Sequence, residues 1–499
     1  MKERFDVMIV GSNIGGLLTG AILAKYGFKL LWIPFPEDVP IFSKGRYLFP
    51  LENPAISGCG EGEILDVALQ ELGLAQDEKR RFHRVVPPIQ LITPRYRIEL
   101  PAERSALATA IAPLLSPHDR PALEPFFETV ERIAGFTNAL ALSGATIPPQ
   151  SLSERLRFDK ESRSLSGKFG LEGEFGSFEE LVRASHFRPE TVRFLEMFLT
   201  AWGYRLPKES SAYTAAHLLS IPMRGFYYIE GGDLVFLRKL LEGRIRALRG
   251  QIEMEIPFER IEKIEFSRKE ARIQAGEKDF AGRLLLWNTA LPRLLPFLPE
   301  KVRRSRFGEK IENLDPALLR FTLLVGMRSQ GIPVGMWHRI LLQANAPLLD
   351  PALGTLYLTL HPLLEGEEER DEKIVILATA FLPLGKGKIV AEEIAPKLER
   401  IAKGILDVLH DVIPFLDDFI EVESTEASVR HFSEGAERGQ GIVFSTSTVG
   451  RLGLSCFSNR TPLQSLLVTG PEIFPGLGFE GEILAGWNAT RFAVDLIKH

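Results

Sequence analysis

Residues 5–34 read FDVMIVGSNIGGLLTGAILAKYGFKLLWIP, and this stretch predicts the fold of the N-terminal part of the chain. The apolar run 5–10 is typical of a strand buried on both faces of a parallel sheet. Glycines follow it, and apolar residues then recur at helical spacing until Gly27. A second apolar run, residues 30–33, predicts the next strand. Together they predict a βαβ unit, whose first turn is where a dinucleotide pyrophosphate binds.

The glycine motif GSNIGG, residues 11–16, departs from the dinucleotide pattern G-x-G-x-x-G. Gly11 and Gly16 match, but Asn13 stands where a glycine normally lets phosphate oxygens approach the backbone. The acid expected about 20 positions further on, which would bind the ribose hydroxyls, is replaced by Pro34. The nearest acidic substitutes are Glu37 and Asp38. The motif therefore predicts the fold more strongly than the cofactor.

The composition is that of an ordinary globular protein, with 45% hydrophobic and 25% charged residues. A chain of 499 residues exceeds the size of one core, so it predicts two domains. The net charge of −5 gives no reason to expect a nucleic acid as partner. Two cysteines, and histidines without paired ligand spacing, give no indication of a metal site. His338 and His361 lie in predicted strands and are interpreted as core or surface residues.

No apolar run approaches the roughly 20 residues that span a bilayer. The first predicted strand begins at residue 5, which leaves no room for a removable signal peptide. We therefore expect a cytoplasmic protein.

The middle of the chain lacks βαβ periodicity and predicts an inserted domain. Residues 89–100 predict a hairpin, 104–142 and 177–202 predict helices, and the polar stretch 144–176 predicts a long mobile loop. Strand-like runs between residues 318 and 382, without helices between them, predict an antiparallel sheet. The apolar stripe of a helix over 390–409 predicts a packing face rather than a membrane anchor.

The C-terminal stretch 466–486, LLVTGPEIFPGLGFEGEILAG, again reads as strand, glycine-rich loop and helix. A helix that begins there places unpaired N–H groups beside whatever the first βαβ unit holds. Such a terminus could stabilise negative charge that develops on a reduced ring system.

These two segments, with KGR at 44–46, YYIEGGD at 227–233 and LLWNTA at 285–290, resemble the flavin-dependent amine oxidase and phytoene desaturase superfamily. The resemblance implies an α/β fold with a discontinuous, Rossmann-type FAD-binding domain of residues 1–80, 225–300 and 440–499. An α+β substrate domain, an antiparallel sheet plus helices, would comprise residues 81–224 and 301–439.

The resemblance also implies an oxidoreductase that transfers hydride to non-covalently bound FAD. Its substrate would be a small apolar molecule, with an isoprenoid as one option, in a cavity between the domains. Because this chemistry belongs to the cofactor, no acid–base pair need be visible, and no catalytic residue is assigned.

The resemblance places the pyrophosphate against the glycine motif and Arg46, and the adenine against Phe258. The flavin's ribityl chain would follow residues 470–472, and its pyrimidine edge would meet 481–483. The implied cofactor-binding residues are Gly11, Ser12, Asn13, Ile14, Gly15, Gly16, Gly45, Arg46, Phe258, Asn288, Gly470, Pro471, Glu472, Gly481, Glu482 and Ile483.

A second hypothesis is a catalytically inactive relative that has lost FAD and binds a lipid or a protein partner. Asn13, Pro34 and Pro471, which replaces the aspartate that commonly follows this glycine, motivate it. Each lost charge-assisted hydrogen bond costs about 1.5–3 kcal/mol of binding. The PGLGFEGE loop at 475–482 favours a retained flavin-like ligand. Electron acceptor, oligomeric state and a peripheral membrane contact are left open.

Overall fold

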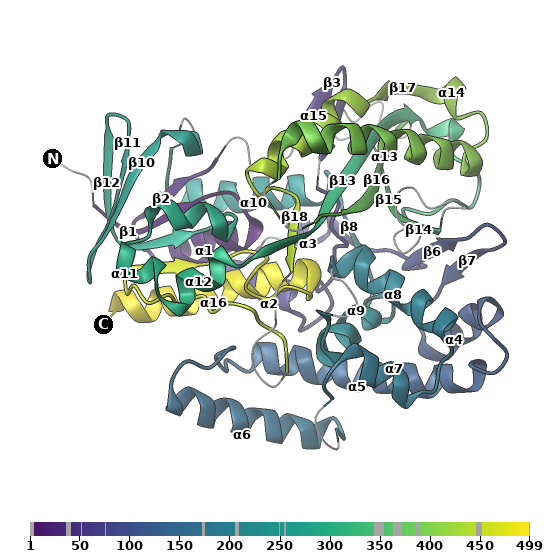
Figure 1. The fold of residues 1–499 in the computed structure, drawn as a ribbon, viewed down its shortest axis with the longest axis horizontal. Coiled ribbons are helices and arrows are strands. Elements are labelled where there is room, and N and C mark those ends of the chain that lie inside the picture. The colour runs from purple at the N-terminus through teal and green to yellow at the C-terminus, as the bar shows by residue number, and fades with distance from the viewer. Residues whose placement is uncertain are drawn as a thin grey trace.

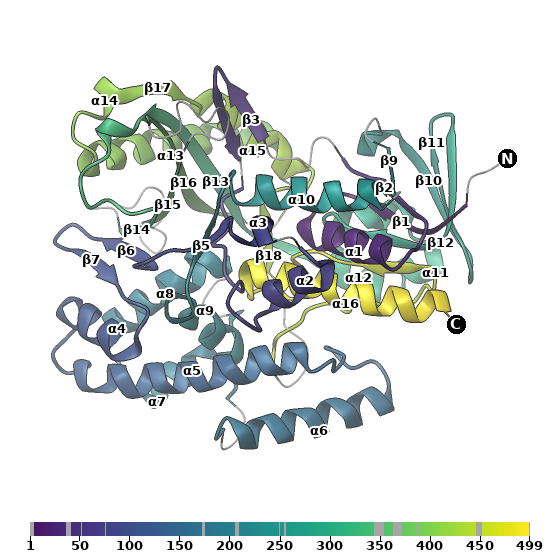
Figure 2. The ribbon, with the colours of Figure 1, turned by 180° about the vertical axis from the view of Figure 1, so that it is seen from behind.

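The computed structural model describes residues 4–35, 41–50, 52–74, 76–171, 175–204, 209–248, 250–253, 256–343, 354–362, 372–385, 387, 389–445 and 452–498. One lobe holds both chain ends and the first sheet. The second sheet and a group of helices form the rest of the molecule (Figures 1 and 2).

The first sheet has seven strands in the order β10–β11–β12–β1–β2–β9, with β19 paired to β12. The strands are β1 (Arg4–Val10), β2 (Leu30–Ile33), β9 (Gln251–Ile252), β10 (Ile261–Phe266), β11 (Ala271–Ala275), β12 (Lys278–Trp287) and β19 (Leu466–Val468). β12, β1, β2, β9 and β19 run parallel, whereas β10 and β11 add an antiparallel edge. Residues 7–10 of β1 are fully buried, as a parallel strand covered on both faces requires.

Three helices contact strands of this sheet, α1 (Ile14–Lys25), α10 (Leu234–Ala247) and α16 (Gly478–Lys498), and a fourth, α2 (Ile64–Leu72), contacts α1. α1 contacts both α10 and α16, and α2 packs on α16. Helices α1 and α16 lie side by side in both views, although they come from opposite ends of the chain (Figures 1 and 2). The predicted βαβ unit is confirmed.

The second sheet has eight strands in the order β17–β13–β16–β15–β14–β6–β7, with β18 paired to β13. It contains β6 (Ile89–Ile92), β7 (Arg97–Leu100), β13 (Asp315–Arg328), β14 (Arg339–Gln343), β15 (Thr355–Pro362), β16 (Lys373–Pro383), β17 (Ile420–Glu423) and β18 (Ile442–Ser445). All pairings are antiparallel except β14 with β6, so the predicted antiparallel sheet is confirmed. β18 shows that residues 442–445 extend this sheet rather than the first one.

Helices α13 (Ala391–Val412) and α15 (Thr425–Glu437) pack together against β13. The apolar stripe of α13 is buried, with Leu398, Ile405 and Leu409 each at 0% exposure. The stripe is therefore a packing face, as its lack of a basic polar face predicts.

A group of helices occupies residues 104–224: α4 (Arg104–Ile111), α5 (Arg120–Leu142), α6 (Leu152–Lys168), α7 (Phe178–Ala184), α8 (Pro189–Gly203) and α9 (Ala212–Arg224). Shorter elements are β3 (Ile41–Lys44), β4 (Tyr47–Pro50), α3 (Gln76–Lys79), β5 (Phe82–Arg84), η2 (Ala112–Leu114), β8 (Tyr227–Ile229), η4 (Phe258–Arg260), η5 (Leu291–Phe297), α11 (Glu300–Arg303), α12 (Arg306–Glu312), η6 (Ser329–Gly331) and α14 (Leu416–Phe419). Within the described ranges, none of the helices has the length and apolar content needed to cross a bilayer.

The prediction of a long loop over 144–176 is wrong, because α6 fills most of it (Figure 1). A capping box starts this helix: Oγ of Ser151 accepts the N–H of Glu154, whose carboxylate accepts the N–H of Ser151 in return. The Glu154 carboxylate also receives both short bonds, 2.6 and 2.7 Å, from Arg460. The Ser-x-x-Glu spacing was the sequence signal for this helix.

We predict that Ser151→Ala frays the start of α6, because an N-cap alanine costs about 0.5–2 kcal/mol of helix stability. Hydrogen–deuterium exchange should show faster exchange of the first-turn amides of α6. Ser164→Ala, at an exposed position inside the same helix, is the control and should leave exchange unchanged. Equal protection in both variants would contradict the capping role.

Candidate functional site

The turn between β1 and α1 has the backbone of a dinucleotide-binding turn. Gly11 leaves β1 at a φ of +104° and donates its N–H to the carbonyl of Ile33 at 2.9 Å. Trp32 Nε1 donates to the Gly11 carbonyl, also at 2.9 Å. Asn13 is the N-cap residue in extended conformation, and its side chain makes no cap hydrogen bond. The first N–H groups of α1 are therefore available to another acceptor.

Asn288 follows β12, and its side chain forms hydrogen bonds with the backbone of this turn. Its Oδ1 accepts the Gly16 N–H at 3.0 Å, and its Nδ2 donates to the Asn13 carbonyl at 2.8 Å. The side chain is fully buried. Asn288 thus bonds to the predicted binding loop itself.

The two glycines of the α1 start are needed for close packing within the chain. A Cβ atom on Gly16 would lie 2.0 Å from Cγ of Asn288. One on Gly15 would lie 2.6 Å from the carbonyl oxygen of Glu482. Both distances are far below van der Waals contact, so a side chain at either position would displace Asn288 or α16.

A carboxylate from α16 occupies the N-terminus of α1. Oε1 of Glu482 accepts the N–H of Ile14 at 2.7 Å, and α1 has no acidic residue in its own first turn. A helix N-terminus attracts anions through its free N–H groups and its dipole, and phosphate binds there in dinucleotide folds. Glu482 therefore stands where the fold would place a phosphate oxygen.

Burial raises the pKa of Glu482 to about 7, and the negative charge of Glu52 adds to the rise. The Arg238 guanidinium and the N–H groups of Ile14 and Gly15 act in the opposite direction and lower the pKa. The carboxyl group therefore changes charge near neutral pH.

Glu472 is a second acid next to the turn, and it is buried, whereas Glu482 is half-buried. Its Oε1 accepts the N–H of Leu291 at 3.4 Å, while Oε2 has no hydrogen-bond partner among the described residues. Burial raises its pKa to about 7, and the charge of Glu482 contributes. Its neighbour Pro471 is exposed, and Gly470 has a φ of +138°.

A chain of alternating charges leads from the turn to the second sheet. Arg238 of α10 donates to the carbonyl of Ser12 and lies 3.4 Å from Oε2 of Glu52. The other oxygen of Glu52 lies 3.3 Å from Nη2 of Arg320 on β13. Arg320 lies over the Tyr204 ring, 5.0 Å from its centroid. This chain connects the first-lobe helices with the second sheet.

Aromatic rings fill the region beyond the end of β2. Phe35, which follows Pro34, is fully buried, and its ring meets that of Phe258 edge-on at 5.3 Å. The Arg293 guanidinium lies over the Phe258 ring, 3.9 Å from its centroid. The Phe297 ring packs edge-on against the Phe258 ring, with the two centroids 5.9 Å apart. Phe258 therefore lies in a packed aromatic group. Glu37 and Asp38 lie outside the described residues.

Gly45 and Arg46 form the exposed turn of the β3–β4 hairpin. Tyr47 of this hairpin donates its hydroxyl to Glu421 at 2.8 Å, and Gly326 of β13 lies against the Tyr47 ring. The hairpin stands beside β17 and α15, whereas α1 lies in the other lobe (Figures 1 and 2). The structure does not bring Arg46 to the α1 turn.

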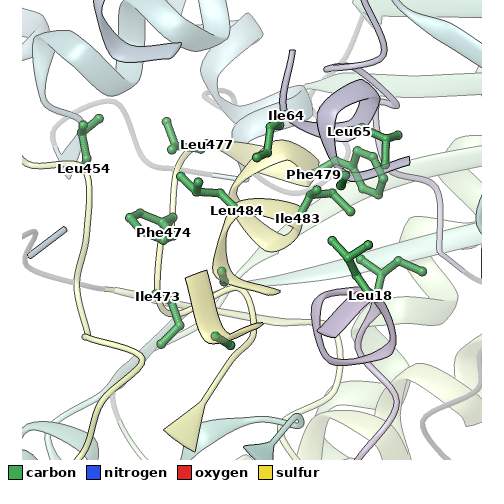
Figure 3. Close-up of a cluster of buried hydrophobic side chains, with 14 of the residues drawn as sticks. Leu18, Ile64, Leu65, Leu454, Ile473, Phe474, Leu477, Phe479, Ile483 and Leu484 are labelled. Carbon is green, nitrogen blue, oxygen red and sulfur yellow. The ribbon is translucent and has the colours of Figure 1, made fainter. Parts of the chain in front are cut away.

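The start of α16 is largely apolar core. Ile483 and Leu484 join Leu18 of α1 and Ile64 and Leu65 of α2 in one hydrophobic cluster (Figure 3). Gly481 donates its N–H to the carbonyl of Leu477 at 3.2 Å. Of the three predicted residues here, only Glu482 reaches the α1 turn with a polar side chain.

Some residues around the α1 turn suit a bound phosphate, and others oppose it. The N–H groups of Ile14 and Gly15 and the Arg238 guanidinium form an anion-binding donor set. The carboxylates of Glu472 and Glu482 oppose a further negative charge, and Glu482 already takes the N–H of Ile14.

A buried cluster that the sequence analysis missed ties α16 to α9. Glu480 accepts from Arg224 at 2.8 and 3.0 Å and from Ser57 at 2.6 Å, and it lies 3.6 Å from His217. Arg224 also bonds Glu63 at 2.9 Å. Burial raises the pKa of Glu480, but the charges of Arg224 and His217 and the hydrogen bonds from Arg224 and Ser57 together outweigh this effect, and the pKa falls to about 2. Burial lowers the pKa of His217 to about 4.

His217 and Glu480 border a cavity of about 20 Å³ whose other walls include Thr137, Asn138 and Leu484. This volume suffices for a single water molecule. The cluster joins residues from three distant parts of the sequence, 57–63, 217–224 and 480, so local spacing gave no signal for it.

A second buried cluster joins α10 to the second sheet. Oδ2 of Asp233 accepts from Arg339 at 2.5 Å and lies 3.5 Å from His361. Arg339 also donates to Thr359 at 2.9 Å. His361 is 1% exposed and thus a core residue, and Nδ1 of His338 lies 3.0 Å from the carbonyl of Leu360.

Neither a protein-family model nor a curated protein sequence matches the chain. Solved structures match over nearly its full length. An oxidoreductase from Methanosarcina mazei is 14% identical with a TM-score of 0.60, covering 98% of this chain and 100% of that one. Cyclohexylamine oxidase from Brevibacterium oxydans is 14% identical with a TM-score of 0.55 and 99% coverage of both chains. A RAB GDI from Plasmodium falciparum is 11% identical with a TM-score of 0.51 and 98% coverage of both chains.

The chain therefore has the fold of the flavin-dependent amine oxidases. The predicted Rossmann-type domain with an inserted substrate domain is confirmed as a fold class, while the domain boundaries stay a prediction.

We predict that Glu480→Gln lowers the free energy of unfolding by about 3–5 kcal/mol, because it breaks a buried ion pair on one side. Urea denaturation measures the change. Glu190→Gln is the control: its partner Arg193 is 70% exposed, and Glu190 is 68% exposed. An exposed pair contributes at most about 1 kcal/mol. Equal losses in the two variants would contradict a special role of the buried cluster.

Proposed function

We propose that the protein is an FAD-dependent oxidoreductase that takes hydride from an apolar organic substrate. One observation carries the proposal: the N-terminus of α1, directly after β1, donates to a carboxyl oxygen at the place where dinucleotide folds bind a phosphate. The bond from the Ile14 N–H to the Glu482 carboxylate is 2.7 Å long. A carboxylate that binds at this place is a stand-in for the phosphate oxygens of a dinucleotide.

The donors that would hold the cofactor come from this chain's own backbone and one guanidinium. The N–H groups of Ile14 and Gly15 would bind the pyrophosphate, and Arg238, which is 6% exposed, would balance its charge. When bound, FAD would supply the hydride acceptor. The protein's part would be to position the reactants and exclude water.

The apolar substrate in this proposal rests on the resemblance of the sequence to the flavin-dependent amine oxidase and phytoene desaturase superfamily. Putrescine oxidase, bound to putrescine, shares the fold with a TM-score of 0.55 at 14% identity and full coverage of both chains. With cyclohexylamine oxidase, it makes amines the alternative substrate class for this chain.

A second candidate function is that of an FAD-free relative that binds a lipid or a protein partner. The carboxylates of the buried Glu472 and the half-buried Glu482 favour it, because each ionised acid repels a pyrophosphate. The sequence favours it too, because Pro34 stands where the dinucleotide pattern places a ribose-binding acid. The fold also occurs in a RAB GDI, so the fold alone does not decide between the two candidates.

The test is a visible absorption spectrum of the desalted protein, followed by a titration with FAD. Flavin bands that stay with the protein, or saturable binding of added FAD, would support the oxidoreductase. A colourless protein that binds no added FAD would overturn it in favour of the second candidate.

We predict that Ile14→Pro lowers FAD affinity about 10- to 100-fold, because one charge-assisted hydrogen bond is worth about 1.5–3 kcal/mol. Proline is tolerated at the first position of a helix, and Asn13 already has the extended conformation that a following proline requires. Ile14→Val, which keeps the N–H, is the matched control. Quenching of flavin fluorescence measures both. Equal affinities would show that FAD does not bind at the α1 terminus.

A further inference from the structure

We propose that Glu482 is an internal competitor for the phosphate position, so that a dinucleotide binds only when this carboxylate leaves the N-terminus of α1. The inference rests on the proposed function, because it concerns the same site. It makes Glu482 the residue that sets which ligands the site accepts.

The position of residue 482 is fixed by the packing of two helices. Thr19 of α1 donates its hydroxyl to the Gly486 carbonyl at 2.9 Å, and a Cβ on Gly486 would lie 2.1 Å from the Gly15 carbonyl oxygen. The backbone of α16 therefore cannot move away from α1 without breaking this contact. Only a rotation of the Glu482 side chain can free the N–H groups.

The charges around Glu482 make the competition direct. Glu52, from the segment after β4, and Glu472, from the loop after β19, repel its carboxylate. Arg238 of α10 attracts it, and the charge of Arg320 on β13 interacts with it as well. A pyrophosphate would add negative charge to a region that already holds three acids and two arginines. Its binding is therefore linked to removal or neutralisation of Glu482.

The unpartnered Oε2 of Glu472 is an independent sign that this region is not fully satisfied without a ligand or a proton. The atom is buried in a side chain that is 5% exposed. Buried carboxylate oxygens normally have hydrogen-bond partners, and protonation would convert this one into a donor.

The decisive experiment compares wild type with Glu482→Ala and Glu482→Gln by isothermal titration calorimetry with FAD, ADP and riboflavin. FAD and ADP carry a diphosphate, whereas riboflavin carries none. We expect Glu482→Ala to bind FAD and ADP at least about 10-fold more tightly than wild type, and riboflavin equally. Glu482→Gln, which keeps an acceptor oxygen without the charge, should gain less. Asp495→Ala, exposed on the same helix, should change nothing.

The outcomes separate the inference from the proposed function. Wild type that binds FAD, with Glu482→Ala no tighter, would overturn the inference and leave the oxidoreductase standing. Tighter ADP binding by Glu482→Ala, with no FAD binding in any variant, would support the inference and overturn the oxidoreductase. Thermal melting of each variant shows that it is folded, and folded variants that bind neither diphosphate would overturn both.

A pH titration tests the same competition without mutation. Because the pKa values of Glu472 and Glu482 are raised to about 7, both acids lose their charge as the pH falls through neutrality. The affinity of the wild type for FAD and ADP should therefore rise as the pH is lowered from 8 to 6. This range extends about one pH unit above and below the two pKa values. The rise should be smaller in Glu482→Ala, where only Glu472 titrates. A flat wild-type profile would contradict the inference.

Discussion

The close contact of α1 with α16 is the constraint on which the rest of the site depends. It exists because Gly15 and Gly486 let the two backbones approach, and Thr19 fastens them with a hydroxyl bond to the Gly486 carbonyl. The contact unites the two ends of the chain over the first sheet. Once it is formed, residue 482 must face the start of α1, and whichever side chain stands there decides what the free N–H groups bind.

Charged side chains, most of them buried, connect this contact with the second lobe. One chain runs from Glu482 through Arg238 and Glu52 to Arg320 on β13, and a separate pair joins Asp233 to Arg339 on β14. Buried ion pairs add little net stability, but breaking one side is costly. Both networks form only where the second sheet brings Arg320 and Arg339 to their acidic partners.

Periodic patterns predicted the elements whose own residues decide their structure. The apolar run of β1, the helical spacing of α1 and the alternating strands of the second sheet are of this kind. The α6 helix was missed because its surface is polar, although Ser151 and Glu154 marked its start. The partner of the Ile14 N–H lies 468 positions away, so no local pattern could reveal it. The same holds for Glu480, which meets Arg224 and His217 of α9 only in the folded chain.

The glycines of a dinucleotide motif are usually interpreted as evidence of a phosphate. In this chain the packing of the fold alone requires them, because Asn288 fills the space beside Gly16 and α16 the space beside Gly15. They would persist whether or not a cofactor binds. The informative positions are those that face the ligand and are free of packing constraints. Glu482 is such a position, since its carboxylate bonds to a helix terminus that water or a phosphate could satisfy equally well. Displacement of this one side chain by a phosphate, rather than the glycine pattern, is therefore what separates the two candidate functions.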